Sequence, residues 1–166
     1  MTIQDIKQLY AYNTWANNRV FDAVSQLTNE QYFQDLKSSY GGIHGTLAHI
    51  LGAHKIWLER WLGKTDLKLL SGNDIASLDE LKLLWNELNE TTMKLIDSFS
   101  DEKLSETYTI TTTKGDVYVH TYQQMLTHLV NHSSYHRGQI TTMLRQLGAK
   151  PIGTDMIVYF REKNRS

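Results

Sequence analysis

The sequence predicts an all-α protein, a four-helix bundle with long crossover connections. Its 166 residues contain a single proline, Pro151, so almost nothing interrupts a helix. Four long segments place apolar residues near the helical period, and most of them begin or end at residues typical of helix ends. The length fits one domain, and neither an internal repeat nor a linker divides residues 1–166.

The first two segments cover the N-terminal part of the chain. The first begins after Thr2, a typical N-cap residue, and its apolar pattern continues to about Leu27. The second follows Gly41 and Gly42 and ends at Gly63, a residue type that commonly terminates helices. Both segments are long enough to span a bundle.

The third and fourth segments begin with a hydroxyl residue followed three positions later by a glutamate or glutamine. Ser77 and Glu80 open the third, and Thr121 and Gln124 open the fourth. Both pairs fit the capping box, in which the two side chains bind each other's backbone amides. The fourth segment ends at Gly148.

Two of the connections are long and carry structure of their own. The stretch TNEQYFQDLKSSYGG is expected to contain a helical turn that opens at Thr28. The stretch TYTITTTKGDVYVHT alternates β-branched residues and tyrosines with polar residues on both sides of Lys114 and Gly115. This alternation predicts a small β-hairpin between the third and fourth helices, and a long crossover is the alternative.

The overall composition excludes several classes of function. A net charge of -1 argues against a general nucleic-acid binder or a protein of anionic membrane surfaces. The N-terminus lacks a secretory signal pattern, and no apolar run approaches the roughly 20 residues of a membrane span. We therefore expect a cytoplasmic protein. The chain has no cysteine, so any metal must be bound by nitrogen or oxygen.

Three histidines recur at a spacing of four in HLVNHSSYHRGQ, at His128, His132 and His136. Residues four apart on a helix differ by about 40° in direction, so either neighbouring pair can aim two imidazoles at one point. The spacing favours a metal site but leaves the pair undecided. Packing of histidines with satisfied hydrogen bonds is the alternative.

A third ligand is expected from a facing helix, because catalytic zinc-type sites usually take three protein ligands. The second segment offers His44, His49 and His54. Steps of five residues rotate by about 140°, so these side chains point in different directions. His49 lies between apolar neighbours in LAHIL, which favours an inward position, whereas His44 and His54 have more polar settings.

Several stretches resemble the DinB/YfiT-like superfamily of small, mostly bacterial proteins, many of them named as damage-inducible. They are YNTWANNRVFDAV, IHGTLAHILGAHKIWLERW and HLVNHSSYHRGQITTMLRQLG, with DMIVYFRE near the end. The resemblance covers nearly the whole chain, and NHxxxHRGQ is its most specific part. It implies a four-helix bundle, a homodimer, and a divalent metal bound by His49, His132 and His136. Nitrogen ligands suit zinc or nickel, and the spacing does not choose between them.

Five further residues are candidates for the surroundings of the metal. His128 would lie one turn before the ligands, and Asn13 and Gln139 would polarise the pocket. Trp15 would line a substrate cavity, and Arg137 would hold an anionic group or cap a neighbouring carboxylate. The alternatives are ordinary helix polarity for the amides, core packing for the tryptophan and solvent exposure for the arginine.

Characterised branches of the superfamily include thiol-dependent transferases and isomerases that use bacillithiol or mycothiol. The resemblance therefore implies an enzyme with a small-molecule substrate and a low-molecular-weight thiol cosubstrate, most simply an S-transferase. A hydrolase using metal-bound water is the first alternative. A hydrolase needs a general base near the metal. The predicted fourth helix has no acidic residue from Thr121 to Gly148, so His128 is the candidate for that base. A non-enzymatic stress protein that binds a metal or small ligand is the second.

Overall fold

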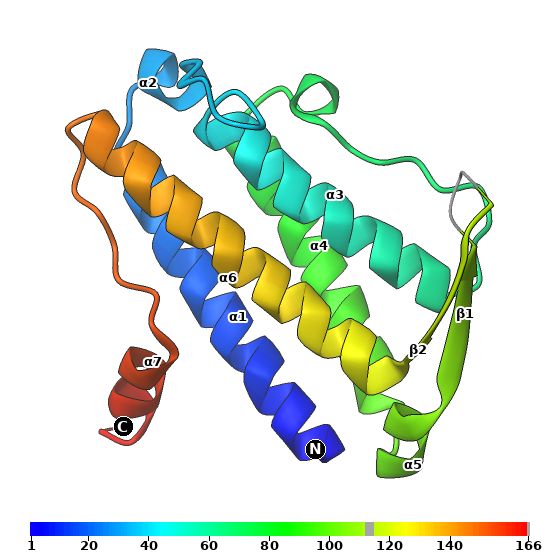
Figure 1. Ribbon diagram of the computed structural model, residues 1–166. Helices are drawn as coiled ribbons and strands as arrows, with labels where there is room; N and C mark the ends of the chain where they lie inside the picture. Colours follow the sequence, from blue (N-terminus) through cyan, green and yellow to red (C-terminus); the bar gives the residue numbers. More distant parts are fainter. Residues whose placement is uncertain (112–114, 166) are drawn as a thin grey trace.

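The computed structural model describes residues 1–111 and 115–165. Four long helices lie side by side (Figure 1). They are α1 (Ile3–Val24), α3 (Ile43–Trp61), α4 (Leu78–Asp97) and α6 (Tyr122–Gln146). Helix α1 packs against α4 and α6, and α3 packs against the same two helices, so the contacts close into a ring. The predicted four-helix bundle is confirmed.

Short helices occupy the connections and the C-terminus. They are α2 (Asn29–Phe33), the 3-10 helix η1 (Gly72–Asp74), α5 (Asp101–Ser105) and α7 (Met156–Lys163). Helix α2 is the helical turn predicted after Thr28, whereas α5 and α7 were not predicted, because segments of five and eight residues carry little periodic signal. None of the described helices has both the length and the apolar character of a membrane span.

The connection between α5 and α6 forms the predicted hairpin. Its antiparallel strands are β1 (Thr107–Thr111) and β2 (Val117–Thr121). The expected turn at Lys114 lies outside the described residues. The Tyr108 hydroxyl donates to the Arg60 carbonyl oxygen at 2.7 Å, near the C-terminus of α3. This hydrogen bond fastens the hairpin to one end of the bundle.

The helix starts follow the local sequence signals closely. At Thr2, Thr28 and Thr121 both halves of a capping box are formed. At Ser77 the box is only half formed: the hydroxyl accepts from the Glu80 amide, but the Glu80 carboxylate accepts from the Ala76 amide at 2.6 Å. The predicted box is therefore wrong in its second half, because the carboxylate binds the amide one residue before the cap.

The bundle interior contains two apolar clusters separated by polar side chains. Along α6, buried members of the first cluster extend to Val130, and those of the second begin at Ile140. The buried polar side chains at intermediate height on the four helices are here called the polar layer. It consists of Asn13, Asn17, His54, Thr92, Ser133, His136 and Arg137.

His54 belongs to this layer, although its sequence setting suggested a more polar position. The side chain is 2% exposed, and its Nε2 donates to the Thr92 hydroxyl at 2.8 Å. That hydroxyl in turn donates to the Leu88 carbonyl oxygen at 2.8 Å, so its oxygen can only accept from the ring. His54 therefore has a structural hydrogen bond between α3 and α4.

The buried position of His54 predicts a loss of stability in mild acid. Burial lowers the pKa of this imidazole from 6.5 to about 4. Between these values the unfolded chain binds the proton and the folded protein does not, so the free energy of unfolding falls as pH falls from about 6.5 toward 4. The full effect is roughly 3 kcal/mol, from about 1.4 kcal/mol per pKa unit. Urea unfolding measured from pH 7 to pH 4.5 tests this, with His54→Gln as the variant whose pH slope should be smaller. An unchanged slope in that variant would contradict the assignment.

Candidate metal centre

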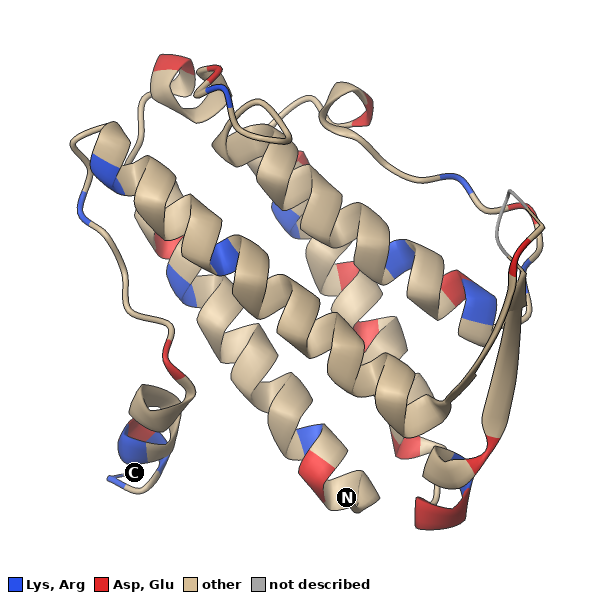
Figure 2. Cartoon of the chain, in the orientation of Figure 1, with Lys and Arg blue, Asp and Glu red and all other residues tan. Residues whose placement is uncertain are grey.

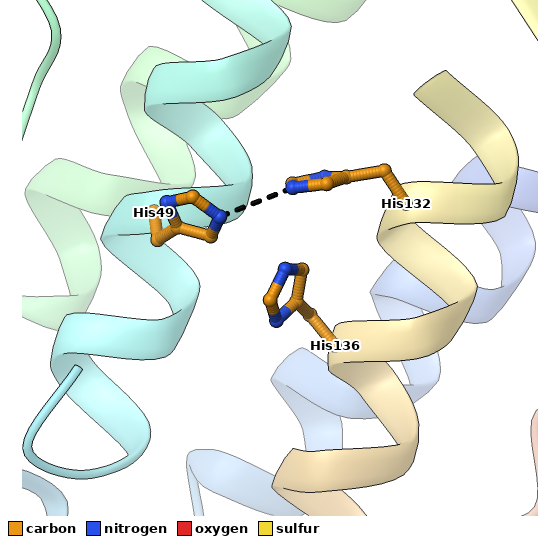
Figure 3. Close-up of side chains that lie close together, drawn as sticks. All are labelled: His49, His132 and His136. Carbon is orange, nitrogen blue, oxygen red and sulfur yellow. Dashed lines mark hydrogen bonds between the residues drawn. The ribbon is translucent and has the colours of Figure 1, made fainter. Parts of the chain in front are cut away.

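Three histidines from two helices converge at mid-height of the bundle. His49 extends from α3, and His132 and His136 extend from successive turns of α6 (Figure 3). One ring nitrogen from each lies within 4.8 Å of the other two. The Nε2 atoms of His49 and His132 are 3.0 Å apart. Tetrahedral zinc would separate such atoms by about 3.3 Å, so the spacing of this pair is close to that of two ligands of one ion.

Two of the imidazoles, those of His49 and His132, have a lowered pKa, which favours the neutral state that metal binding requires. Burial, followed by repulsion from the neighbouring histidines, lowers the pKa of His132 to about 4. Burial and His136 also lower the pKa of His49. At neutral pH only one of the two facing Nε2 atoms can carry hydrogen, so the other presents a bare lone pair. The donor set therefore suits a divalent cation.

Gln139 orients one of the three rings. Its Oε1 lies 2.7 Å from Nδ1 of His136, one turn earlier on α6. A carbonyl oxygen only accepts, so the ring donates from Nδ1 and keeps the lone pair on Nε2. Histidine ligands in metal sites are usually oriented in this way. The His132 Nδ1 atom is also buried but has no hydrogen-bond partner among the described residues.

Tyr40 covers one side of the cluster and was not found by the sequence reasoning. Its ring stacks on His49 with centroids 3.9 Å apart and planes 13° apart, and it meets the edge of His136 at 5.6 Å. A side chain at Gly45 would collide with the Tyr40 carbonyl oxygen, so this glycine lets the loop lie against the first turn of α3. The tandem glycines after Tyr40 were interpreted only as a helix start.

His128 lies next to the cluster but outside it. Its ring centroid is 6.0 Å from that of His132 and 5.8 Å from that of Trp57, and the side chain is exposed. The structure therefore brings the pair His132 and His136 to His49 and leaves His128 one turn away. Of the two pairs that the spacing left open, His132 and His136 are the one that lies close to His49.

Arg137 extends from α6 toward α1, where it contacts Asn13. Arg137 is only 1% exposed, and its guanidinium donates to Asn13, to Asn17 at 2.8 Å and to Ser134 at 2.8 Å. The expected solvent exposure of Arg137 is therefore wrong, and the partners of its guanidinium are neutral oxygens in place of the predicted anion or carboxylate. Arg137 follows His136 by about 100° around the helix, which turns it from α3 toward α1.

Trp15 is also away from the histidines. Its indole Nε1 donates to the Glu162 carboxylate on α7 at 2.9 Å, and the Arg19 guanidinium lies 4.9 Å from the ring centroid. The Trp15 side chain therefore connects α1 to the C-terminal helix α7. The predicted role in lining a substrate cavity does not fit this position.

Comparison with known proteins agrees with this fold. The chain is 31% identical to Protein DinB of Bacillus subtilis (strain 168), covering 92% of this chain and 91% of that protein. It is 26% identical to the uncharacterized protein YizA of the same organism, over 90% and 92% of the two chains. A crystal structure of a DinB-like protein from Bacillus cereus shares the fold, with a TM-score of 0.59 and 20% identity over 92% of this chain and 97% of that one. The DinB family model matches residues 2–165, and the chain therefore belongs to the DinB family.

Proposed function

We propose that this protein is a divalent-metal-dependent enzyme that transfers a low-molecular-weight thiol to a small electrophile. The convergence of His49, His132 and His136 within 4.8 Å carries the proposal. These residues would hold the ion, and neutral nitrogen donors suit zinc or nickel. When bound, the ion supplies Lewis-acid chemistry that lowers the pKa of a coordinated thiol from its ordinary value of about 8.5.

The protein's own residues position the reactants. The chain has no cysteine, so the sulfur must arrive with the cosubstrate. Gln139 fixes the orientation of His136, and Tyr40 shields His49 from one side. In the transfer, a bond forms between the thiol sulfur and the electrophilic carbon, and the leaving group departs with the electrons of its own bond to that carbon. The thiol proton passes to solvent. Exclusion of water and alignment of the two reactants are the protein's contribution to the rate.

Hydrolysis is the second candidate, and one geometric observation supports it. A metal-bound water needs a general base, and α6 contains no acidic residue (Figure 2). His128, at 6.0 Å between ring centroids from His132, is then the nearest imidazole outside the proposed ligands. A proton transfer over this span would require an intervening water.

The decisive experiment combines metal content with turnover, on protein without a histidine tag. Elemental mass spectrometry would give the stoichiometry after incubation with zinc or nickel. The loaded and metal-free proteins would then be assayed with cysteine or bacillithiol and 1-chloro-2,4-dinitrobenzene, and separately with a nitrophenyl ester. Metal-dependent conjugation that requires the thiol is the expected result. Ester cleavage without thiol would favour the hydrolase, and bound metal with neither activity would favour a non-enzymatic binder.

Gln139 provides a test of the metal centre that leaves all three proposed ligands in place. We expect Gln139→Leu to weaken zinc binding about 10- to 100-fold, because His136 loses the acceptor that holds its ring and its tautomer. Competition with a chromophoric chelator would measure the change. Gln146→Leu, at an exposed position of the same helix, is the matched control and should bind zinc normally. Equal affinity in both variants would exclude this orienting role.

A further inference from the structure

A cavity lies one helical turn from the histidine cluster, where α3, β2 and the start of α6 meet. Its volume is about 320 Å³, and it is lined by Trp57, His120, Gln124, Met125 and His128. In Figure 1 these three elements come together at the hairpin end of the bundle. The volume lies at the small end of the range for ligand pockets, which fits a compound with one ring.

The cavity and Tyr40 lie on opposite sides of the cluster along α3. Tyr40 precedes α3 and covers His49 and His136. Trp57 lies two turns beyond His49 on the same helix, in the opposite direction along its axis. Ring contacts at 5.8 Å and 6.0 Å connect Trp57 to His128 and His128 to His132. His128 therefore lines the cavity on one side and contacts His132 of the cluster on the other.

The cavity wall combines an apolar surface with free hydrogen-bonding groups. Met125 is buried and Trp57 is half-buried. Among the described residues, neither the His120 ring nor the His128 ring has a hydrogen-bond partner, and each neutral imidazole offers a donor and an acceptor. Within residues 1–111 and 115–165, no carboxylate lines the cavity, and the Arg60 guanidinium lies 5.3 Å from the Trp57 ring centroid. These features favour a flat ring with an electron-rich oxygen and disfavour a cationic ligand.

We propose that this cavity binds the electrophilic substrate, and that the substrate is a small aromatic compound of one ring with a hydrogen-bond-accepting oxygen. This substrate class rests on the proposed thiol transfer. Trp57 and Met125 contact the ring, and His120 and His128 donate to the oxygen. The reactive carbon is thereby directed toward His132 and the thiol.

The test uses 4-fluorobenzoate as the probe and fluorine NMR as the readout, first on metal-free protein. We expect saturable binding whose dissociation constant rises at least fivefold in Trp57→Leu and in His128→Leu. Trp15→Leu makes the same change at a tryptophan outside the cavity and should bind the probe normally. Trifluoroacetate, which has the carboxylate but no ring, should not bind. Circular dichroism of each variant confirms that it is folded.

A second arm tests the connection to the metal centre. Nickel bound by the proposed ligands should broaden the resonance of the bound probe, and zinc should not. Absence of saturable binding to the metal-free protein, or a dissociation constant in both cavity variants that is unchanged from the parent protein, would overturn the proposal. Unchanged line width with stoichiometric nickel would place the probe away from the cluster and overturn it as well. If the protein binds no metal, only the proposed thiol transfer is contradicted. The measurement on metal-free protein still decides whether the cavity binds the aromatic probe.

Discussion

Replacing His132 with alanine is expected to abolish stoichiometric metal binding, with zinc affinity lowered at least 100-fold. His132 is close to both of the other donors: its Nε2 is 3.0 Å from that of His49, and its ring centroid is 4.4 Å from that of His136. Without it the site offers two nitrogen donors in place of three, fewer than catalytic zinc sites normally have. Elemental mass spectrometry after zinc incubation and dialysis, followed by chelator competition, measures the loss.

His128→Ala is the matched control, because it removes the same side chain one turn earlier on the same helix. His128 is exposed and outside the cluster, so this variant should keep its metal and the parent affinity within a few fold. Retention of near-stoichiometric zinc by His132→Ala would show that the cluster is packing only. Equal loss in both variants would mean that the metal is bound by the other histidine pair.

Arg137→Leu is expected to reduce the free energy of unfolding by about 3 kcal/mol. The guanidinium lies in the polar layer and donates to the side-chain oxygens of Asn13 and Asn17 from α1 and of Ser134 from α6. Removing it leaves the two buried amide oxygens without donors, and an unpaired buried acceptor costs about 1–3 kcal/mol. Urea denaturation followed by circular dichroism gives the change.

Two further variants separate the polar network from general damage to α6. Arg145→Leu changes an exposed arginine on the same helix and should alter stability by less than about 0.5 kcal/mol. The double variant Arg137→Leu with Asn13→Leu removes donor and acceptor together and should recover part of the loss. An Arg137→Leu protein as stable as the parent would show that the hydrogen bonds are not energetically coupled.

The helices and the hairpin were predictable because their signals are local. The hydroxyl residue at Thr121 and the glutamine three positions later define the start of α6 without reference to any other helix. The alternation after residue 107 identified both strands for the same reason. The capping box predicted at Ser77 was wrong in one half even though it is a local pattern. The Glu80 carboxylate can accept from the backbone amide of Ser77 or from that of Ala76, and it accepts from Ala76.

The sequence could predict those features of the candidate site that depend on residues of a single helix. The spacing of the histidines indicated that α6 would present two of them together, and the apolar neighbours of His49 indicated an inward position. The burial of His54 and Arg137 was missed, because each depends on a partner more than 30 positions away in the chain, Thr92 and Asn13 respectively. The stacking of Tyr40 on His49 depends in the same way on how a loop returns to α3.

The buried arginine also has a consequence for the alignment of α6. His128, His132 and His136 form a ladder that repeats every turn, so a shift of α6 by one turn, about 5–6 Å, would present a different but chemically equal pair to His49. Metal coordination alone cannot distinguish these two registers. Arg137 can, because the same shift would carry it away from Asn13 and Asn17 and into an apolar cluster. The hydrogen bonds on the α1 side of the helix thereby select which histidines meet on the α3 side.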